Sequence, residues 1–116
     1  MELEKKRTIY IFKNYFTDFI AEQKEEVKNK IIWVFRIIET QPTIPKVYFK
    51  HIQGTKGLYE IRIQFGNNSL RIFCFFDKGN IIILANGFHK KTNKTPVGTI
   101  KKAIKIQKEY EAAKDT

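Results

Sequence analysis

The sequence is poor in the residues that form disulfides, metal sites and membrane spans: it contains one cysteine, two histidines and no long apolar run. A single cysteine, Cys74, excludes a disulfide framework. Two histidines and one cysteine are too few for an ordinary zinc site, so we expect neither a metal nor another cofactor. Nowhere do about eighteen consecutive apolar residues occur, and the N-terminus lacks the apolar stretch of a secretory signal. We therefore expect a cytoplasmic protein that makes no contact with a membrane.

Acidic residues are also scarce, since 12 Asp and Glu stand against 22 Lys and Arg, which leaves a net charge of +10. Such an excess favours a polyanion as partner, because each neutralised phosphate releases bound counterions. A basic but inert surface is the plainer explanation, and charge alone does not decide between the two. The 116 residues contain no internal repeat and no low-complexity linker, so they predict one domain over residues 1–116.

Residues 58–91 predict three antiparallel strands in succession. The first alternates apolar and polar side chains, as a half-buried strand does. The last is apolar at every position, which is typical of a strand covered on both faces. The strands are expected at 58–65, 70–76 and 81–85, with turns at Gly66–Ser69 and at Lys78-Gly79. We expect a meander whose third strand is central.

The lengths of these turns predict the pairing, because loop length sets the register of a hairpin. A four-residue turn puts Arg62 opposite Phe73, and a two-residue turn puts Arg71 opposite Asn86. One face then carries Glu60, Arg62, Gln64, Arg71, Phe73, Phe75, Asn86, Phe88 and Lys90. The other face is an aliphatic core of Ile61, Ile63, Leu70, Ile72, Cys74, Ile81 and Ile83. A bulge at Gly87 would put His89 on the first face in place of Lys90.

Helices are expected on both sides of this meander in the sequence. Residues 8–12 predict a short strand at an edge of the sheet, followed by a helical hairpin that breaks near Gln23–Glu26. The core stripe of the hairpin is Val27, Ile31, Val34, Phe35 and Ile38, widened by Trp33 and Ile37. Pro42 and Pro45 end it, and Val47–Gly57 is expected to be a loop. Thr95 and Pro96 predict the start of a last helix whose core stripe is Ile100, Ala103, Ile104, Gln107 and Tyr110.

Three segments, Lys50–Arg62, Leu70–Phe76 and Gly87–Pro96, resemble HigB-type toxins, which belong to the RelE/ParE superfamily of toxin–antitoxin modules. The likeness is to a branch first described from phage proteins, and it covers nearly the whole chain. It implies a RelE-like α+β fold, in which an N-terminal strand and a helical hairpin pack on an antiparallel meander with a C-terminal helix. The unaided pattern of strands and helices predicts the same architecture.

The resemblance also implies an activity, the cleavage of messenger RNA in the ribosomal decoding site by attack of a ribose 2′-hydroxyl, without a metal. Such chemistry needs a base, an acid and stabilisation of the added charge. Glu60 is the candidate base, Arg62 and Arg71 would hold the phosphate, His89 would be the acid, and Lys90 would contact a phosphate. A cognate helix-turn-helix antitoxin is the expected protein partner. Further candidates for RNA contact are Lys50, His51, Lys56, Phe73, Phe88, Lys91, Lys94, Lys101 and Lys105.

Structural explanations compete with these roles. Glu60 pairing with Arg62 or Arg71 on an exposed sheet is as good an explanation as catalysis. An exposed pair contributes only about 0–1 kcal/mol, so Arg71→Ala is expected to stay folded. Some relatives place a catalytic tyrosine near the end of the chain, whereas Tyr110 lies on the core stripe of the last helix.

Two other functions remain open. One is a ParE-like poison of DNA gyrase, which needs no catalytic carboxylate or histidine. The other is a catalytically inactive, phage-derived module that binds nucleic acid. Glu60, two arginines and His89 on or near one face favour the nuclease, although a fold does not determine a function.

Overall fold

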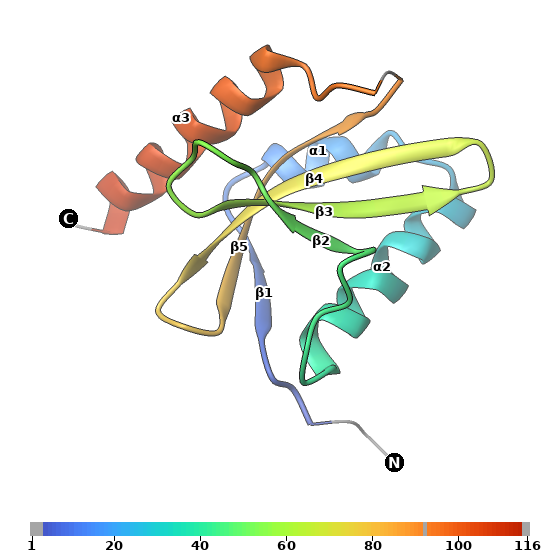
Figure 1. The fold of residues 1–116 in the computed structure, drawn as a ribbon, viewed down its shortest axis with the longest axis horizontal. Coiled ribbons are helices and arrows are strands. Elements are labelled where there is room, and N and C mark those ends of the chain that lie inside the picture. Colours follow the sequence, from blue (N-terminus) through green and yellow to red (C-terminus); the bar gives the residue numbers. More distant parts are fainter. Residues whose placement is uncertain (1–3, 92, 115–116) are drawn as a thin grey trace.

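A computed structural model describes residues 4–91 and 93–114. Its elements are β1 (Thr8–Ile11), α1 (Tyr15–Ala21), α2 (Glu25–Thr40), β2 (Phe49–His51), β3 (Leu58–Phe65), β4 (Asn68–Asp77), β5 (Ile81–His89) and α3 (Val97–Lys114). The strands form one sheet in the order β1-β5-β4-β3-β2. Helices α1 and α2 pack on one face of this sheet and α3 packs on the other (Figure 1). The α+β architecture expected from the sequence is confirmed.

In the N-terminal half, the elements agree with those predicted from the sequence except for one strand, β2, which was not predicted. β1 pairs in parallel with β5, so the predicted edge strand is confirmed. The third strand of the meander, β5, was predicted to be central, and this was wrong: β5 has a neighbour on each side, but β4 is the middle strand of the five, because β2 adds a strand beyond β3. The hairpin breaks between Ala21 and Glu25, close to the predicted place. The segment expected to be a loop contains β2, which pairs with β3 and widens the sheet.

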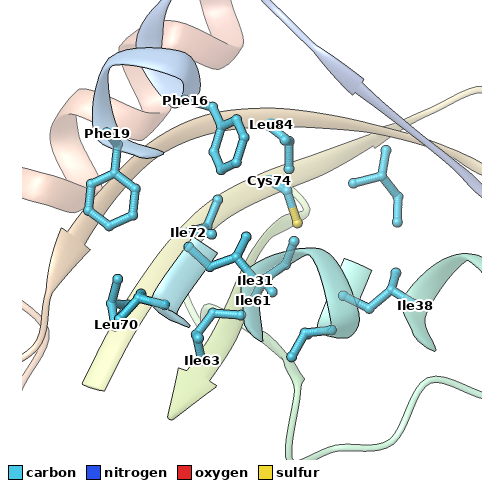
Figure 2. Packing of buried hydrophobic residues seen from close by; sticks show 13 residues of the cluster. Phe16, Phe19, Ile31, Ile38, Ile61, Ile63, Leu70, Ile72, Cys74 and Leu84 are labelled. Carbon is cyan, nitrogen blue, oxygen red and sulfur yellow. The ribbon is translucent and has the colours of Figure 1, made fainter. Parts of the chain in front are cut away.

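The main core lies between the helical hairpin and the sheet. The spacing of apolar residues in α2 turns one stripe of the helix inward. Its buried members are Val27, Ile31, Val34 and Ile38. They meet Phe16 and Phe19 of α1 over the aliphatic side chains of the sheet, as Figure 2 shows. Cys74 is fully buried there, and this burial raises the pKa of its thiol far above the ordinary value.

Trp33 departs from the prediction that it widens this core stripe. Its side chain is 48% exposed. The indole packs edge-on against Tyr48, with ring centres 5.9 Å apart. Trp33 therefore faces the segment before β2 and not the sheet.

The turn between β3 and β4 is shorter than predicted. Phe65 pairs with Asn68, so only Gly66 and Asn67 form the turn. Gly66 has a φ of 58°, the left-handed geometry that a tight hairpin turn needs. Asn68 and Ser69, which have the composition of a turn, belong to the ladder instead. The register moves by two residues, so Arg62 faces Arg71, and each side chain keeps its predicted face.

The turn between β4 and β5 is longer than predicted. Asp77 pairs with Ile81, and Lys78 and Gly79 both have positive φ. This shift by one residue reverses the faces of the first half of β5, because strand side chains alternate. Ile81 and Ile83 therefore lie on the α3 side and not in the aliphatic core, where Ile82 and Leu84 take their places. An irregularity between Ile72 and Cys74 then shifts the register again.

A second, smaller core joins α3 to the other face of the sheet. Its fully or nearly fully buried residues are Leu58, Phe73, Phe75, Ile83, Ala85, Ala103 and Ile106. Ile106 was not predicted to be in the stripe, whereas Gln107 lies beside it and donates a hydrogen bond to the carbonyl of Lys56. The helix begins at Val97, one residue after the expected Pro96.

Candidate active site

Three charged side chains meet on the face of the sheet that α3 partly covers. Glu60 and Arg62 are two residues apart on β3, so they point to the same side. The ladder places Arg71 of β4 directly opposite Arg62. The Nε atoms of both arginines lie 3.8 Å from Oε1 of Glu60. The shared face predicted for these residues is confirmed, and their chemical roles stay predictions.

This charged cluster, Glu60, Arg62 and Arg71, is mostly buried. The side chains of Glu60 and Arg71 are 5% and 8% exposed, whereas that of Arg62 is 35% exposed. Arg71 Nη1 donates to the carbonyl of Leu70 at 3.0 Å and to Ser69 Oγ at 3.1 Å. Burial, and then the charge of Arg62, lowers the pKa of Arg71, while Glu60 opposes the shift. Arg62 is therefore the cation of the cluster that solvent reaches.

The cluster has hydrogen-bonding capacity that the described residues do not use. Oε2 of Glu60 and Nε of Arg71 are buried without a hydrogen-bond partner. Most buried polar atoms in proteins have a partner, because an unpaired one loses its hydration without compensation. An acceptor and a donor left unpaired side by side are suited to a polar ligand.

Asn86 adds a third such atom that sequence reasoning did not assign to the site. Its side chain is buried, and Nδ2 donates to the carbonyl of Thr99 in α3 at 3.2 Å. Its Oδ1 is buried without a partner. The signal in the sequence was an amide that interrupts the apolar run of β5. Asn86 therefore links the polar part of this face to the first turn of α3.

Two neighbours of Glu60 have different environments. Lys50 of β2 is opposite Glu60 in the β2–β3 ladder and is exposed, so its ammonium group lies on the same face. Phe73 of β4 is opposite Glu60 on the other side and is fully buried. Its ring stacks on Phe88, with centres 5.4 Å apart. Phe73 belongs to the α3 core and cannot stack on a base, so the expectation that it contacts RNA was wrong. Phe88 is only half-buried.

A cavity of about 510 Å³ gives access to the two arginines near the C-terminal end of β3, beyond the residues that pair with β2. Its lining residues are Lys30, Val47, Tyr48, Arg62, Ile63, Gln64 and Arg71. The backbone N–H of Arg62 donates to the carbonyl of Tyr48 at 2.9 Å, which fixes the segment before β2 against β3. Three of the lining side chains are cationic and none is acidic, so the cavity is suited to an anionic ligand.

His89 does not join the cluster. It pairs with Leu70, whose side chain is in the aliphatic core, so His89 points to the α1 side of the sheet. Its ring lies 5.8 Å from that of Phe19. A Cβ on Gly87 would stand 2.5 Å from the same phenyl ring, so α1 approaches the backbone of β5 closely. The sheet separates His89 from Glu60, and the predicted acid is not beside the predicted base.

The remaining cations are distributed around the site. Lys90 follows β5, and its backbone N–H donates to the carbonyl of Ser69 at 2.7 Å. Lys91 and Lys94 are exposed between β5 and α3, and Lys56 is exposed before β3. His51 points away from Lys50, with its ring 5.2 Å from Tyr59.

Lys101 and Lys105 lie away from the charged cluster. Both are exposed on α3 and line a different cavity, together with Tyr15 and Glu109. Any contact they make with RNA is therefore remote from Glu60. Their position is consistent with a contact to the phosphate backbone and not with chemistry.

Tyr110 has the structural position that the sequence predicts. Its ring packs edge-on against Phe12 and Phe75. Its hydroxyl donates to a carboxylate oxygen of Asp77, and this hydrogen bond raises the pKa of Tyr110 to about 12. Tyr110 therefore holds α3 on the sheet.

Two further findings concern the described ranges 4–91 and 93–114 only. They contain no group of three or more His, Cys, Asp or Glu side chains placed to hold a metal ion. None of the helices in them is both long enough and apolar enough to cross a membrane.

Comparison with known proteins identifies the fold and the family. The archaeal RelE–RelB complex from Pyrococcus horikoshii OT3 has a chain that is 16% identical, with a TM-score of 0.54 over 73% of this chain and 96% of that one. The RelB–RelE antitoxin–toxin complex from Methanococcus jannaschii has a chain that is 21% identical, with a TM-score of 0.52 over 74% and 98%. At these identities the likeness establishes a RelE-like fold. No curated protein matches the sequence. The family model described as "Phage derived protein Gp49-like (DUF891)" matches residues 18–108, so the chain belongs to this phage-derived family, as its resemblance to HigB-type proteins predicted.

Proposed function

We propose that this chain is the toxin of a type II toxin–antitoxin pair and a metal-independent endoribonuclease that cuts messenger RNA in the ribosomal decoding site. One observation carries the proposal: Glu60 is a buried carboxylate with an unpaired oxygen, held between the guanidinium groups of Arg62 and Arg71. The RelE-like fold and the family support the toxin role, since the solved neighbours are described as RelE–RelB and antitoxin–toxin complexes.

The chemistry follows from these three side chains. The ribose 2′-hydroxyl attacks the adjacent phosphorus, a 2′,3′-cyclic phosphate forms, and the 5′-oxygen of the next nucleotide leaves. Oε2 of Glu60 accepts the 2′ proton. Arg62 and Arg71 bind the non-bridging oxygens and stabilise the added charge of the phosphorane, for which guanidinium groups are suited. Both arginines line the cavity, whereas Glu60 does not. The proposal therefore requires Arg62, the more exposed arginine, to move so that RNA in the cavity reaches Oε2 of Glu60.

The acid in this proposal is Lys50 and not His89. Lys50 is exposed opposite Glu60, so its ammonium group can protonate the leaving 5′-oxygen. Lys90, Lys91 and Lys94 are proposed contacts for backbone phosphates after β5, and the half-buried Phe88 is a proposed contact for a base.

The proposed protein partner is a small helix-turn-helix antitoxin that covers or distorts the active face. The net charge of +10 favours a partner with an acidic surface, because complementary charge steers association. Expression of the chain alone should arrest growth, and co-expression of the neighbouring gene should restore it. A chain that is harmless alone and binds no neighbour would contradict the pairing.

Cleavage of a defined message on programmed ribosomes tests the nuclease. Primer extension should reveal new 5′ ends in the decoding site with the wild-type chain. Arg62→Ala should slow single-turnover cleavage by about 10²- to 10³-fold, the usual effect of removing one group that stabilises the transition state. Arg36→Ala, at an exposed arginine of α2, is the matched control and should cut at the wild-type rate.

The other outcomes point to other functions. Intact message together with gyrase-linked DNA breaks would favour a ParE-like poison. Neither cleavage nor breaks, with binding of nucleic acid retained, would favour an inactive binding module. Cleavage by Arg62→Ala at the wild-type rate would mean that the active site is elsewhere on the chain.

A further inference from the structure

An aromatic and cationic groove lies beside the charged cluster, and the proposed chemistry does not use most of it. Trp33 of α2 is 48% exposed and Val47 is 66% exposed. Trp33 contacts Tyr48 edge-on, and Lys30 Nζ lies 4.4 Å from the centre of the indole ring. Large apolar side chains exposed together require an explanation, since most such residues are buried.

This groove, which Lys30, Val47 and Tyr48 line and Trp33 borders through its contacts with Lys30 and Tyr48, is continuous with the two arginines of the site. Lys30, Val47 and Tyr48 line the same cavity of about 510 Å³ as Arg62 and Arg71. Tyr48 is also fixed to β3, because its carbonyl accepts the backbone N–H of Arg62. An occupant of the groove would therefore lie next to any phosphate bound by Arg62.

The chemistry of the groove indicates the class of occupant. Aromatic rings that alternate with cations are typical of surfaces for single-stranded nucleic acid, where bases stack on rings and cations follow the backbone. The residues that line the cavity include three cations and no carboxylate. A purely apolar partner would cover these cations without supplying an anion to offset their excess positive charge, whereas a nucleotide uses both the rings and the charges.

We propose that the groove of Lys30, Trp33, Val47 and Tyr48 binds unpaired nucleotides of RNA that flank the phosphate held by Arg62 and Arg71. A base stacks on Trp33 or Tyr48, and Lys30 pairs with a neighbouring phosphate. That the nucleotides belong to a cleaved RNA rests on the proposed function, while the binding itself does not. Stacking tolerates every base, so the groove adds affinity and alignment and little sequence preference.

The chain contains a single tryptophan, so Trp33 reports on its own groove. A short single-stranded oligouridylate, titrated into the wild-type chain without ribosomes, should quench the emission of Trp33. Inorganic polyphosphate of equal charge carries no bases and should bind without comparable quenching. Because Trp33→Ala removes the reporter, affinities of the variants are measured by the anisotropy of a dye-labelled oligouridylate. Trp33→Ala and Tyr48→Ala should each weaken its binding by about 5- to 150-fold, the loss typical of one stacking ring. Tyr10→Ala, at an exposed tyrosine of β1, is the matched control and should bind as the wild type does.

The results separate this inference from the proposed nuclease. Quenching by oligouridylate from a chain that never cuts message would support the groove and contradict only the nuclease. Normal cleavage would leave the nuclease intact. If oligouridylate then did not change the Trp33 emission of the wild type, and both variants bound it with unchanged affinity, the proposed binding of nucleotides in the groove would be overturned. Equal quenching by polyphosphate would also overturn it. A response of Trp33 to the co-expressed neighbouring protein but not to RNA would overturn it in favour of a protein-docking surface.

Discussion

Burial makes the two arginines of the charged cluster unequal. Both Nε atoms are 3.8 Å from the same oxygen of Glu60, yet the side chain of Arg62 is 35% exposed and that of Arg71 is 8% exposed. The expectation that Arg71 forms an exposed ion pair was wrong, because its side chain is buried and its Nη1 donates hydrogen bonds to Ser69 Oγ and the carbonyl of Leu70. Arg62 is therefore the residue that tests function, and Arg71 also supports the fold.

Urea denaturation should separate the two arginines. Arg71→Ala should lower the free energy of unfolding by about 3 kcal/mol, because it leaves the buried carboxylate of Glu60 poorly compensated. Arg62→Ala should lower it by only about 0–1 kcal/mol, as for a solvent-screened pair. Glu60→Leu combined with Arg71→Met is the control, since replacing both buried charges by apolar groups is often neutral. Equal losses for the two single variants would show that burial is not what distinguishes them.

At the scale of elements, polar contacts hold the end of α3 on the sheet. Tyr110 and Lys114 both donate to Asp77, and Glu109 accepts from Tyr15 and Lys13. The hydrogen bond from Lys114, and then that from Tyr110, lowers the pKa of Asp77 from its ordinary value of 3.8. A lowered carboxyl pKa means that the contribution of Asp77 to stability is present above about pH 3.8 and is lost as the pH falls below it. For Tyr110 the sign is opposite: its contribution is complete below pH 10.0 and is lost as the pH rises through about 12.

Asp77→Asn should therefore have an effect that depends on pH. The variant should melt at a lower temperature than the wild type at pH 7, and the difference should shrink as the pH falls below 3.8 and Asp77 becomes protonated. Tyr110 in the variant should titrate nearer to 10.0 than to about 12, because its anionic hydrogen-bond partner is gone. Circular dichroism melts over a pH series and the absorbance of phenolate measure the two effects. Lys114→Met is the control, and in this variant Tyr110 should keep its raised pKa. If the titration of Tyr110 were unchanged in Asp77→Asn, Asp77 would not be its hydrogen-bond partner in solution.

At the scale of the whole molecule, the net charge of +10 is distributed over several surfaces. Arg62 and Lys30 line the cavity beside the charged cluster, whereas Lys101 and Lys105 line another cavity with Tyr15. Phosphates bound at both places would add to affinity, but only those beside Glu60 would affect chemistry. Salt dependence of binding distinguishes the two contributions, because each neutralised phosphate releases counterions.

Binding of RNA or ribosomes should weaken steeply with salt. Lys101→Ala combined with Lys105→Ala should lower the log–log slope by roughly 0.7 for each phosphate that α3 no longer neutralises, without abolishing cleavage at saturation. Lys6→Ala combined with Lys24→Ala removes the same charge elsewhere on the surface and is the control. An equal change of slope in both double variants would mean that only net charge matters and that α3 makes no specific interaction with phosphate.

The sequence by itself determined every element except β2, and the chemistry available to the chain. Alternation over residues 58–65 and the stripe of α2 specified a strand and a helix, because burial of one face requires a period of two or of 3.6 residues. Two-residue spacing was enough to put Glu60 and Arg62 on one side of β3. The segments that resemble HigB-type proteins pointed to the phage-derived family. The match of the family model to residues 18–108 then showed that the chain belongs to it.

Only the tertiary structure decided which of these residues meet. The turn after β4 is one residue longer than its composition suggested, and the irregularity near Phe73 shifts β5 by one more residue. The first shift alone reverses the faces of Ile81 and Ile83, whereas both shifts together return Phe88 to the face of Glu60 and leave His89 on the other face, as strand parity without a bulge at Gly87 predicted. β2 forms because β3 offers an unpaired edge, a condition that the sequence of Phe49–His51 does not reveal. Trp33 looks like a core residue by spacing, yet its exposure depends on where the segment before β2 packs. Register, edges and helix orientation depend on pairings between distant segments, and local propensity does not encode them.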